Sequence, residues 1–280
     1  MTEPGDPFDA YRTIRYLDAV RRLPEVARAK ARILDLLDLQ LGQRALDVGC
    51  GTGEDVWALA ERVGPTGSAE GVDASPWSIG EARRRADAAD PRPSGSYRVG
   101  DVYALPYPAA SFDAVRAERL FVHLNDPAAA LRELRRVTRS GGVVLVADAS
   151  FATLRLAGPP LALTERVVRH TCDRFASGRI GSALAGLFVE AGLEAVEAVA
   201  MEHVARTVTE ADTLFTFAQT TAEMIHSGVA AESEVAAWQR DLARREQCGT
   251  LGWHVTGYIV CGRVPRMCPC DERGESAARR

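Results

Sequence analysis

The chain has 280 residues, of which 46% are apolar and 26% charged, as in ordinary globular domains. The net charge of −4 argues against a nucleic-acid partner, because proteins that bind nucleic acids usually carry a basic face. No stretch reaches the roughly 18 apolar residues that span a bilayer, and the N-terminus lacks the regions of a secretory signal. We therefore expect no membrane partner and a cytoplasmic location.

Six cysteines are scattered at positions 50, 172, 248, 261, 268 and 270. In a reducing cytosol, free thiols are the default. Cys268 and Cys270 lie in a polar tail, 265–280, which is predicted to be disordered, and no partner at zinc spacing accompanies them. We expect no metal site.

From residue 44 to residue 150, strands and helices alternate. The apolar runs at 44–48 and 142–148 are typical of buried strands, and further strands are predicted at 68–73, 96–101 and 112–118. Helices are expected at 54–63 and after the capping pairs Ser75-Pro76 and Asp126-Pro127. This rhythm predicts an α/β fold, a doubly wound Rossmann-like sheet of mainly parallel strands with right-handed crossovers.

Two further segments flank this core, 41–150. A helical segment, 1–40, precedes it, with the aromatic residues Phe8, Tyr11 and Tyr16. Segment 151–264 follows, with an irregular stretch at 151–182, strands at 193–207 and 253–264, and two helices within 210–247. These helices are expected to cover the substrate, although their apolar residues are equally consistent with plain core packing; they are Leu214, Phe215, Phe217, Met224 and Ile225.

The segment LDVGCGTGE, Leu46–Glu54, lies between the first strand and the helix that follows it. Its glycines allow a sharp turn close to a ligand, at the sheet edge where doubly wound folds bind ligands. A dinucleotide fingerprint would carry a third glycine where Glu54 stands, and that carboxylate and Asp47 would repel a pyrophosphate. An acidic turn suits S-adenosylmethionine, which carries a sulfonium and an ammonium and no phosphate.

A carboxylate also ends the second predicted strand. Asp73 lies 24 residues beyond Gly49, close to the spacing of roughly 20 expected of an acidic residue that binds ribose hydroxyls. The alternative interpretation is a polar residue that only shapes the turn after the strand.

Four segments together resemble the class I S-adenosylmethionine-dependent methyltransferases, in particular the small-molecule group that includes the ubiquinone and menaquinone enzymes. They are LDVGCGTGE, GVDASPWSI, GDVYALPYPAASFDAV and FVHLNDPAAALRELRRVTRSGGVVLVAD. The resemblance covers about residues 40–150. It implies a seven-stranded sheet, closed by an antiparallel pair formed by the last two strands.

The resemblance also implies cofactor roles for matching positions. Gly49, Gly51 and Asp47 would lie at the methionine part of the cofactor, and Glu118 near the same end. The nucleoside would meet Asp73 at its ribose hydroxyls and the residues Ala74, Ser75, Asp101 and Val102 around its adenine.

Two residues are candidates for the chemistry on the acceptor. His123 follows the fourth strand, where a neutral imidazole can take a proton from the acceptor; it can equally pack or cap beside Asp126. Asp148 ends the fifth strand and is a second candidate base or orienting residue, or else a loop cap. The other histidines, at positions 170, 203, 226 and 254, are expected to be structural or exposed, and Cys50 a small buried side chain.

The sequence thus predicts methyl transfer from S-adenosylmethionine to an oxygen, nitrogen or carbon of a small organic acceptor, with specialised metabolism as one setting and a homodimer as one state. One alternative is an enzyme of the same fold that uses the cofactor without transferring a methyl group. Another is a nicotinamide-dependent oxidoreductase, against which Glu54 speaks. A nucleobase methyltransferase is disfavoured because no Asn-Pro-Pro-aromatic motif follows the fourth strand.

Overall fold

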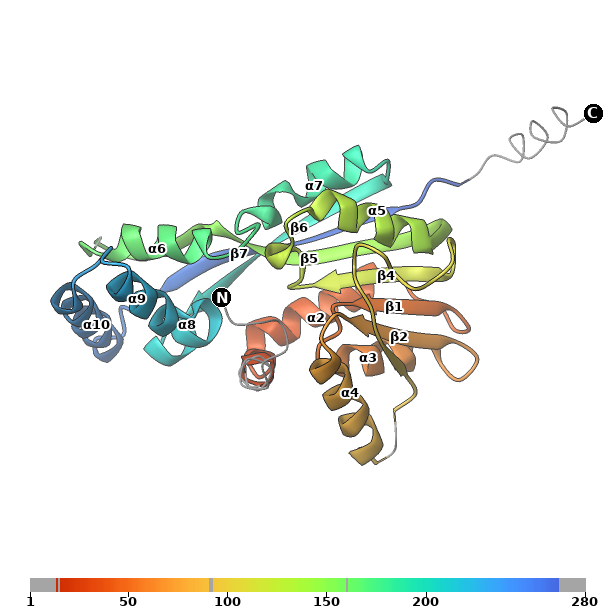
Figure 1. The fold of residues 1–280 in the computed structure, drawn as a ribbon, viewed down its shortest axis with the longest axis horizontal. Coiled ribbons are helices and arrows are strands. Elements are labelled where there is room, and N and C mark those ends of the chain that lie inside the picture. Colours follow the sequence, from red (N-terminus) through yellow and green to blue (C-terminus); the bar gives the residue numbers. More distant parts are fainter. Residues whose placement is uncertain (1–13, 15, 91–92, 160, 267–280) are drawn as a thin grey trace, which may run out of the picture.

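The computed structural model describes residues 14, 16–90, 93–159 and 161–266. A seven-stranded sheet in the order β3-β2-β1-β4-β5-β7-β6 runs through it (Figure 1). Strands β1 to β5 are parallel, and β7 pairs antiparallel with both β5 and β6. The predicted seven-stranded sheet with an antiparallel last strand is confirmed. The strands are β1 (Arg44–Val48), β2 (Ser68–Asp73), β3 (Ser96–Val99), β4 (Phe112–Glu118), β5 (Thr138–Leu156), β6 (Glu194–Ala205) and β7 (Trp253–Arg263).

Helices cover both faces of the sheet. In Figure 1, α3 and α4 lie below it and α5 and α7 above it, while α2 crosses the lower side near β5 and β6. Two of them start as the sequence predicts: the Ser75 hydroxyl accepts the N–H of Ser78 at 3.2 Å, and Asp126 accepts the N–H of Ala129 at 2.8 Å. The bounds are α2 (Pro24–Leu36), α3 (Glu54–Val63), α4 (Pro76–Ala88), α5 (Pro127–Val137) and α7 (Ile180–Glu190).

Strand β5 corrects one expectation. It continues eight residues beyond the predicted strand and alone has 19 residues, so the stretch 151–182 is not irregular. The outer part of β5 is followed by α6 (Thr164–Asp173) and then by α7. After a register shift, Arg155 and Leu156 pair with His254 and Trp253 of β7. Pairing with a strand about one hundred residues away decides this segment, and local sequence patterns carry no signal of such pairing.

A second correction concerns the helices before β7. Three helices form there instead of two: α8 (Val208–Phe215), α9 (Phe217–His226) and α10 (Glu232–Gln247). Thr216 separates the first two because its φ of +54° is left-handed, and the Asp212 carboxylate then accepts the N–H of Ala218 at 2.7 Å. A threonine carries no turn signal, so the break was not expected. These three helices and α6 lie together at the left end of Figure 1, where β5 and β7 reach them.

Most central strand residues are buried on both faces, as expected for a parallel sheet between helices. Leu46, Val115 and Val144 are 0% exposed, and burial of each such side chain contributes about 1.5–3 kcal/mol relative to exposure. Within the described ranges, no helix has the length and apolar character needed to cross a membrane.

Candidate active site

The turn after β1 is built on glycines with left-handed backbone. Gly49 has φ +75°, and its N–H and that of Cys50 donate to the Val72 carbonyl at 2.7 and 3.1 Å, which ties the turn to β2. A Cβ on Gly49 would lie 3.1 Å from the Leu120 side chain, so glycine leaves space between the two segments. The turn lies between β1 and β4, where the strand order reverses and doubly wound sheets bind ligands.

Asp73 connects this turn to the start of α4. Its Oδ2 accepts the N–H of Gly51 at 2.9 Å, and its Oδ1 accepts the N–H of Ser75 at 2.8 Å. Burial raises the pKa of Asp73 above its usual value, and these two hydrogen bonds work against that rise. Each carboxylate oxygen has a second lone pair, so Asp73 can accept two ribose hydroxyls while it holds the turn.

A charge cluster lies beside the turn, made of Lys30, Asp47, Asp55, Arg116 and Glu118. The Arg116 side chain is 2% exposed; its guanidinium lies 3.2 Å from Asp47 and 3.3 Å from Asp55, and it also pairs with Glu118. Lys30, the only lysine of the chain, pairs with Asp55 and lies 3.3 Å from Glu118. Residues from α2, α3, β1 and β4 are thereby joined through their charges.

The two most buried carboxylates of this cluster titrate in opposite directions. Burial raises the pKa of Asp47, against the opposing charge of Arg116. Burial also opposes ionisation of Glu118, yet the charges of Lys30, Arg119 and Arg116 hold its pKa below the usual range. Glu118 therefore stays ionised at neutral pH, as a carboxylate that receives an ammonium group must.

The negative charge of Glu54 is balanced by more partners than the sequence indicates. It forms ion pairs with Arg85 and, at 2.5 Å, with Arg21, and it accepts the Thr52 hydroxyl at 2.6 Å. Its charge is compensated by these arginines, so Glu54 opposes a pyrophosphate less than expected. The preference for a phosphate-free cofactor rests instead on Asp73, Asp47 and Glu118.

The N-terminal helical residues 16–21 lie over this region. Asp18 receives Arg85 at 2.7 and 3.0 Å, and the Leu17 side chain comes within 3.0 Å of the position of a Cβ on Gly51. Tyr16 lines the same cavity as the turn. Phe8 and Tyr11 lie outside the described residues.

One large cavity, of about 1060 Å³, brings most of the expected site residues together. It exceeds the 300–1,000 Å³ typical of a pocket for one small ligand, so it has room for a cofactor and an acceptor side by side. The expected residues in its lining are Asp47, Gly49, Gly51, Asp73, Ala74, Ser75, Glu118, His123 and Asp148.

Asp101 and Val102 lie apart from this lining. Asp101 is exposed and accepts the N–H of Tyr103 at 2.9 Å, and Val102 is 8% exposed and packs in the apolar core. Their roles at the adenine stay predictions.

A hydrogen bond connects the two segments that carry the catalytic candidates, Asp148 and His123. Asp148 is 5% exposed, and its Oδ2 accepts the N–H of Val122 at 3.0 Å, which holds the short 3-10 turn η1 (Phe121–His123) against the end of β5. Burial raises the pKa of Asp148 to about 7. The His123 side chain lines the cavity, and its burial lowers the pKa of the imidazole. The imidazole is therefore neutral and can accept a proton.

His203 is a lining residue that sequence reasoning placed among the structural histidines. It extends from β6 into the cavity, and a Cβ on Gly257 of β7 would lie 2.7 Å from its Nε2. An isolated glycine within a strand signals such a close approach, so Gly257 was the available clue. His170 and His254 instead lie near Glu223 and Glu202, at 3.8 and 3.2 Å.

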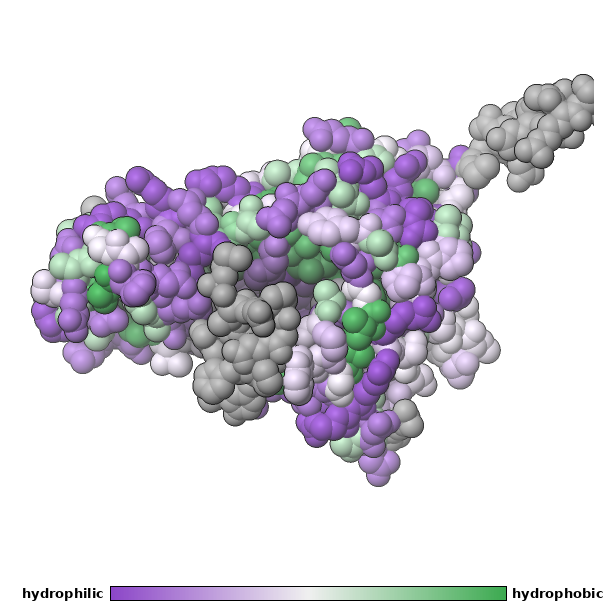
Figure 2. All heavy atoms as spheres, in the orientation of Figure 1, coloured by the Kyte–Doolittle hydropathy of each residue, from purple (hydrophilic) through white to green (hydrophobic). Residues whose placement is uncertain are grey.

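The end of the cavity beyond His123 is apolar and aromatic. Phe151 and Phe175 stack with ring centroids 4.5 Å apart, and Leu214 and Phe215 of α8 close the wall. Phe217 and Met224 are buried core residues, so only part of the expected covering set lines the cavity. Figure 2 shows a largely hydrophilic face, with hydrophobic side chains gathered around the hollow near its middle.

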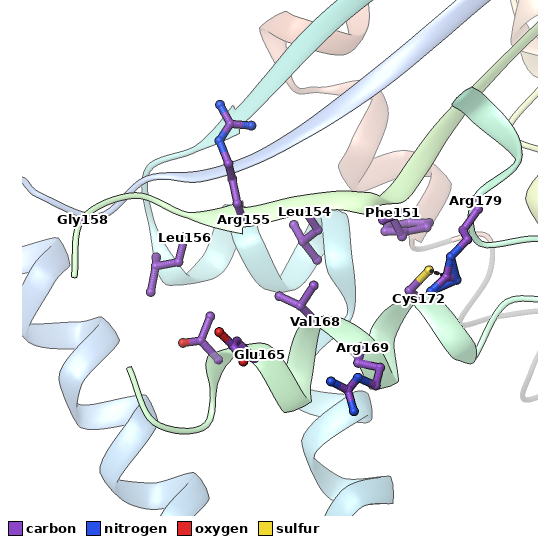
Figure 3. A pocket seen from close by; sticks show the side chains of 12 residues that line it. Phe151, Leu154, Arg155, Leu156, Gly158, Glu165, Val168, Arg169, Cys172 and Arg179 are labelled. Atoms are coloured by element: carbon purple, nitrogen blue, oxygen red, sulfur yellow. Dashed lines mark hydrogen bonds between the residues drawn. The ribbon is translucent and has the colours of Figure 1, made fainter. Parts of the chain in front are cut away.

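A smaller cavity, of about 440 Å³, lies between the outer half of β5 and α6 (Figure 3). Phe151 belongs to both linings. Arg179 points toward the Cys172 sulfur, 3.7 Å away, and Arg169 lies on the α6 side of this cavity. Among the described residues, no group of three or more His, Cys, Asp or Glu side chains is arranged to hold a metal ion.

Comparison with known proteins agrees with this geometry. Residues 45–142 match the model of a methyltransferase domain. The chain is 32% identical over 252 residues to an uncharacterized 37.1 kDa protein of transposon Tn4556 from Streptomyces fradiae, covering 90% of this chain and 71% of that protein. It is 37% identical over 153 residues to the nocamycin O-methyltransferase of Saccharothrix syringae, which covers 53% of this chain and about half, 52%, of that enzyme.

The fold itself is shared with solved structures. The YcgJ protein of Bacillus subtilis superposes with a TM-score of 0.62 at 18% identity, covering 86% of this chain and 100% of that chain. The chain belongs to the S-adenosylmethionine-dependent methyltransferases, and S-adenosylmethionine is its cofactor. The nicotinamide alternative is thereby set aside.

Proposed function

We propose that this protein transfers the methyl group of S-adenosylmethionine to a small organic acceptor with an apolar body, in the specialised metabolism of a reducing cytoplasm. The supporting observation is the single cavity that runs from Asp73 and the glycine turn, past Glu118, to His123 and the aromatic wall. The nocamycin enzyme, by its name an O-methyltransferase, supports the acceptor class and the setting. Free thiols at Cys50, Cys172, Cys248 and Cys261 fit a reducing compartment.

The residues fit the cofactor in three ways. The spare lone pairs of Asp73 suit ribose hydroxyls, and the glycine turn admits a close ligand. The ionised Glu118 suits an ammonium group. Bound S-adenosylmethionine supplies an activated methyl group on a positively charged sulfur.

The chain's own contribution is to hold the acceptor in line with that methyl group and to exclude water. Fixing two reactants in this way lowers the barrier by several kcal/mol, about 7–11 in the best cases. Where the acceptor atom carries a proton, the neutral His123 imidazole takes it as the new bond to the methyl carbon forms. Aromatic side chains line the acceptor side of the cavity and exclude water from it; they are Phe151, Phe175 and Phe215.

Calorimetry with S-adenosylhomocysteine tests the cofactor half of this proposal. Asp73→Asn removes a charged acceptor from two backbone N–H groups and from the ribose, which should weaken binding about 10- to 100-fold, or roughly 1.5–3 kcal/mol. The matched control is Glu61→Gln, which removes one exposed carboxylate of α3. Equal affinity of Asp73→Asn and the unaltered protein, or no binding at millimolar ligand, refutes the proposed site.

Formation of S-adenosylhomocysteine from S-adenosylmethionine tests the reaction. A panel of phenols, carboxylic acids, amines and β-dicarbonyl compounds with apolar bodies is expected to contain acceptors that release it in step with methylated product. Tight cofactor binding together with rearranged, unmethylated products would favour the non-methylating alternative.

A further inference from the structure

Arg119 occupies an unusual backbone position at the centre of the cavity. It follows the last residue of β4 with φ +54°, a left-handed conformation that costs a non-glycine residue energy and is concentrated at functional sites. Its backbone N–H donates to the Ala147 carbonyl of β5 at 2.9 Å, which fixes this conformation. The side chain then lines the cavity between the ends of β4 and β5.

Two nitrogens of the Arg119 guanidinium are buried and have no hydrogen-bond acceptor among the described residues. They are Nε and Nη1. The carboxylate of Glu118 lies 3.8 Å from Nε, too far for a hydrogen bond, and it is already shared between Lys30 and Arg116. An unpaired buried donor costs about 1–3 kcal/mol, and more when it is charged, so this arrangement calls for an external acceptor.

Arg119 faces groups on the acceptor side of the cavity. Besides Glu118, which is an expected cofactor contact, its charge acts on the phenol of Tyr16, the carboxyl of Asp148 and the imidazole of His203, which are not. Burial raises the pKa of Tyr16 and Asp148 and lowers that of His203. Arg119 is therefore a permanent positive charge on this side of the cavity. Arg174 also lines the cavity, but its guanidinium already pairs with Glu223 and donates to Thr216 and Thr220. The other charges acting on His203 are those of Glu118 and Glu25, which are negative, and that of Arg28, which is positive.

We propose that Arg119 binds a carboxylate of the acceptor, so that the substrates of this enzyme are acids with an apolar body. The planar guanidinium presents N–H groups in a fork that matches the two oxygens of a carboxylate, while the stacked Phe151 and Phe175 accommodate the apolar part. This inference rests on the proposed methyl transfer to a small acceptor and adds the acceptor's charged group.

A matched pair of probes tests it: anthraquinone-2-carboxylate and anthraquinone-2-carboxamide, titrated into full-length protein saturated with S-adenosylhomocysteine. The unaltered protein should bind the acid at least tenfold more tightly than the amide. Arg119→Gln should reduce that ratio to below twofold, and Arg119→Lys should keep part of it. Arg119→Asn repeats the test with a residue that tolerates left-handed backbone, and Arg132→Gln on α5 is the exposed arginine control.

Cofactor affinity is measured first in every variant, so that the two proposals fail separately. If the unaltered protein does not bind S-adenosylhomocysteine, the proposed function fails. If it binds and Arg119→Gln binds equally well, the probe result decides on Arg119 alone. Equal binding of acid and amide, an acid preference that survives Arg119→Gln, or no binding of either probe at millimolar concentration overturns the inference. One further result would overturn the inference: Arg119→Gln binds S-adenosylhomocysteine tenfold more weakly but binds methylthioadenosine, which lacks the carboxylate, as tightly as the unaltered protein does. That result would assign Arg119 to the cofactor's own carboxylate.

Discussion

The imidazole of His123 meets the ring of Phe175 edge-on, with 5.4 Å between the ring centroids. Phe175 in turn stacks on Phe151, so the candidate base borders the aromatic wall on which the proposed acceptor rests. His123 is held there because η1 is tied to Asp148 through the N–H of Val122.

If His123 is the base, His123→Ala should slow turnover by about 10²- to 10⁴-fold, because general-base catalysis contributes that much. Affinity for S-adenosylhomocysteine should stay within about threefold, since no hydrogen bond or ion pair among the described residues joins the imidazole to Asp73 or the glycine turn. Release of S-adenosylhomocysteine with an identified acceptor is the readout. If His123→Ala slows turnover less than tenfold, His123 is not the base. If His203→Ala slows turnover more than His123→Ala does, His203 is the base instead.

Asp148 should make stability depend on pH. Its pKa rises from 3.8 to about 7 on folding, so the folded state favours the protonated carboxyl. The stability that this group contributes is present below about pH 4 and is lost as pH rises through about 7. One pKa unit corresponds to about 1.4 kcal/mol, so the loss amounts to a few kcal/mol.

Urea unfolding at pH 5 and pH 8 measures this difference. The fall in free energy of unfolding between the two values should be smaller in Asp148→Asn, whose side chain does not titrate. An identical fall in the variant and the unaltered protein would show that Asp148 is ionised in the folded state across this range.

Lys30 offers a direct view of the charge cluster because it is the only lysine. Its side chain is 15% exposed and pairs with Asp55, so amine-reactive reagents should modify residue 30 at least tenfold more slowly than the N-terminal amine. Asp55→Asn removes one partner and should speed the modification. Mass spectrometry of the two peptides separates the signals; equally fast labelling of both amines in the unaltered protein would contradict the pairing.

Gly53 and Gly186 should respond to alanine in opposite directions. A Cβ on Gly53 would lie 2.6 Å from the Tyr97 ring and 2.9 Å from Ala82, on left-handed backbone, whereas one on Gly186 of α7 meets nothing within 4 Å. Gly53→Ala should destabilise the protein by about 2 kcal/mol or more, and Gly186→Ala should stabilise it by up to about 1 kcal/mol. Chemical denaturation measures both, and a neutral Gly53→Ala would show that the Tyr97 ring moves away freely.

The sheet from β1 to β4 follows from the sequence because its strands are short and most of them end near a glycine or a helix cap. Ser75 and Asp126 illustrate this: their hydrogen bonds are local, so the residues that form them are close together in the chain. The outer half of β5 is different, because its partners lie on β7 and only the folded chain brings Arg155 beside His254.

Some residues of the site could likewise be predicted from the sequence, and others could not. The turn and Asp73 are encoded in consecutive motifs, and the cavity contains them together. Lys30 and Arg119 had no motif: one comes from a helix before the core and the other from a strained residue after β4. Lys30, the only lysine of the chain, lies within the charge cluster, where it contacts Asp55 and Glu118.

The length of β5 has an evolutionary consequence. One continuous strand of 19 residues carries Asp148 at the cofactor edge and Phe151 at the acceptor wall, then runs on to the terminal helices. If the proposed acceptor wall is right, substitutions in α8, which contributes Leu214 and Phe215 to it, can therefore alter which compound is accepted while the strand maintains its separation from the methyl donor. Divergence toward new substrates in such a lineage requires no change in the half of the chain that recognises the nucleoside.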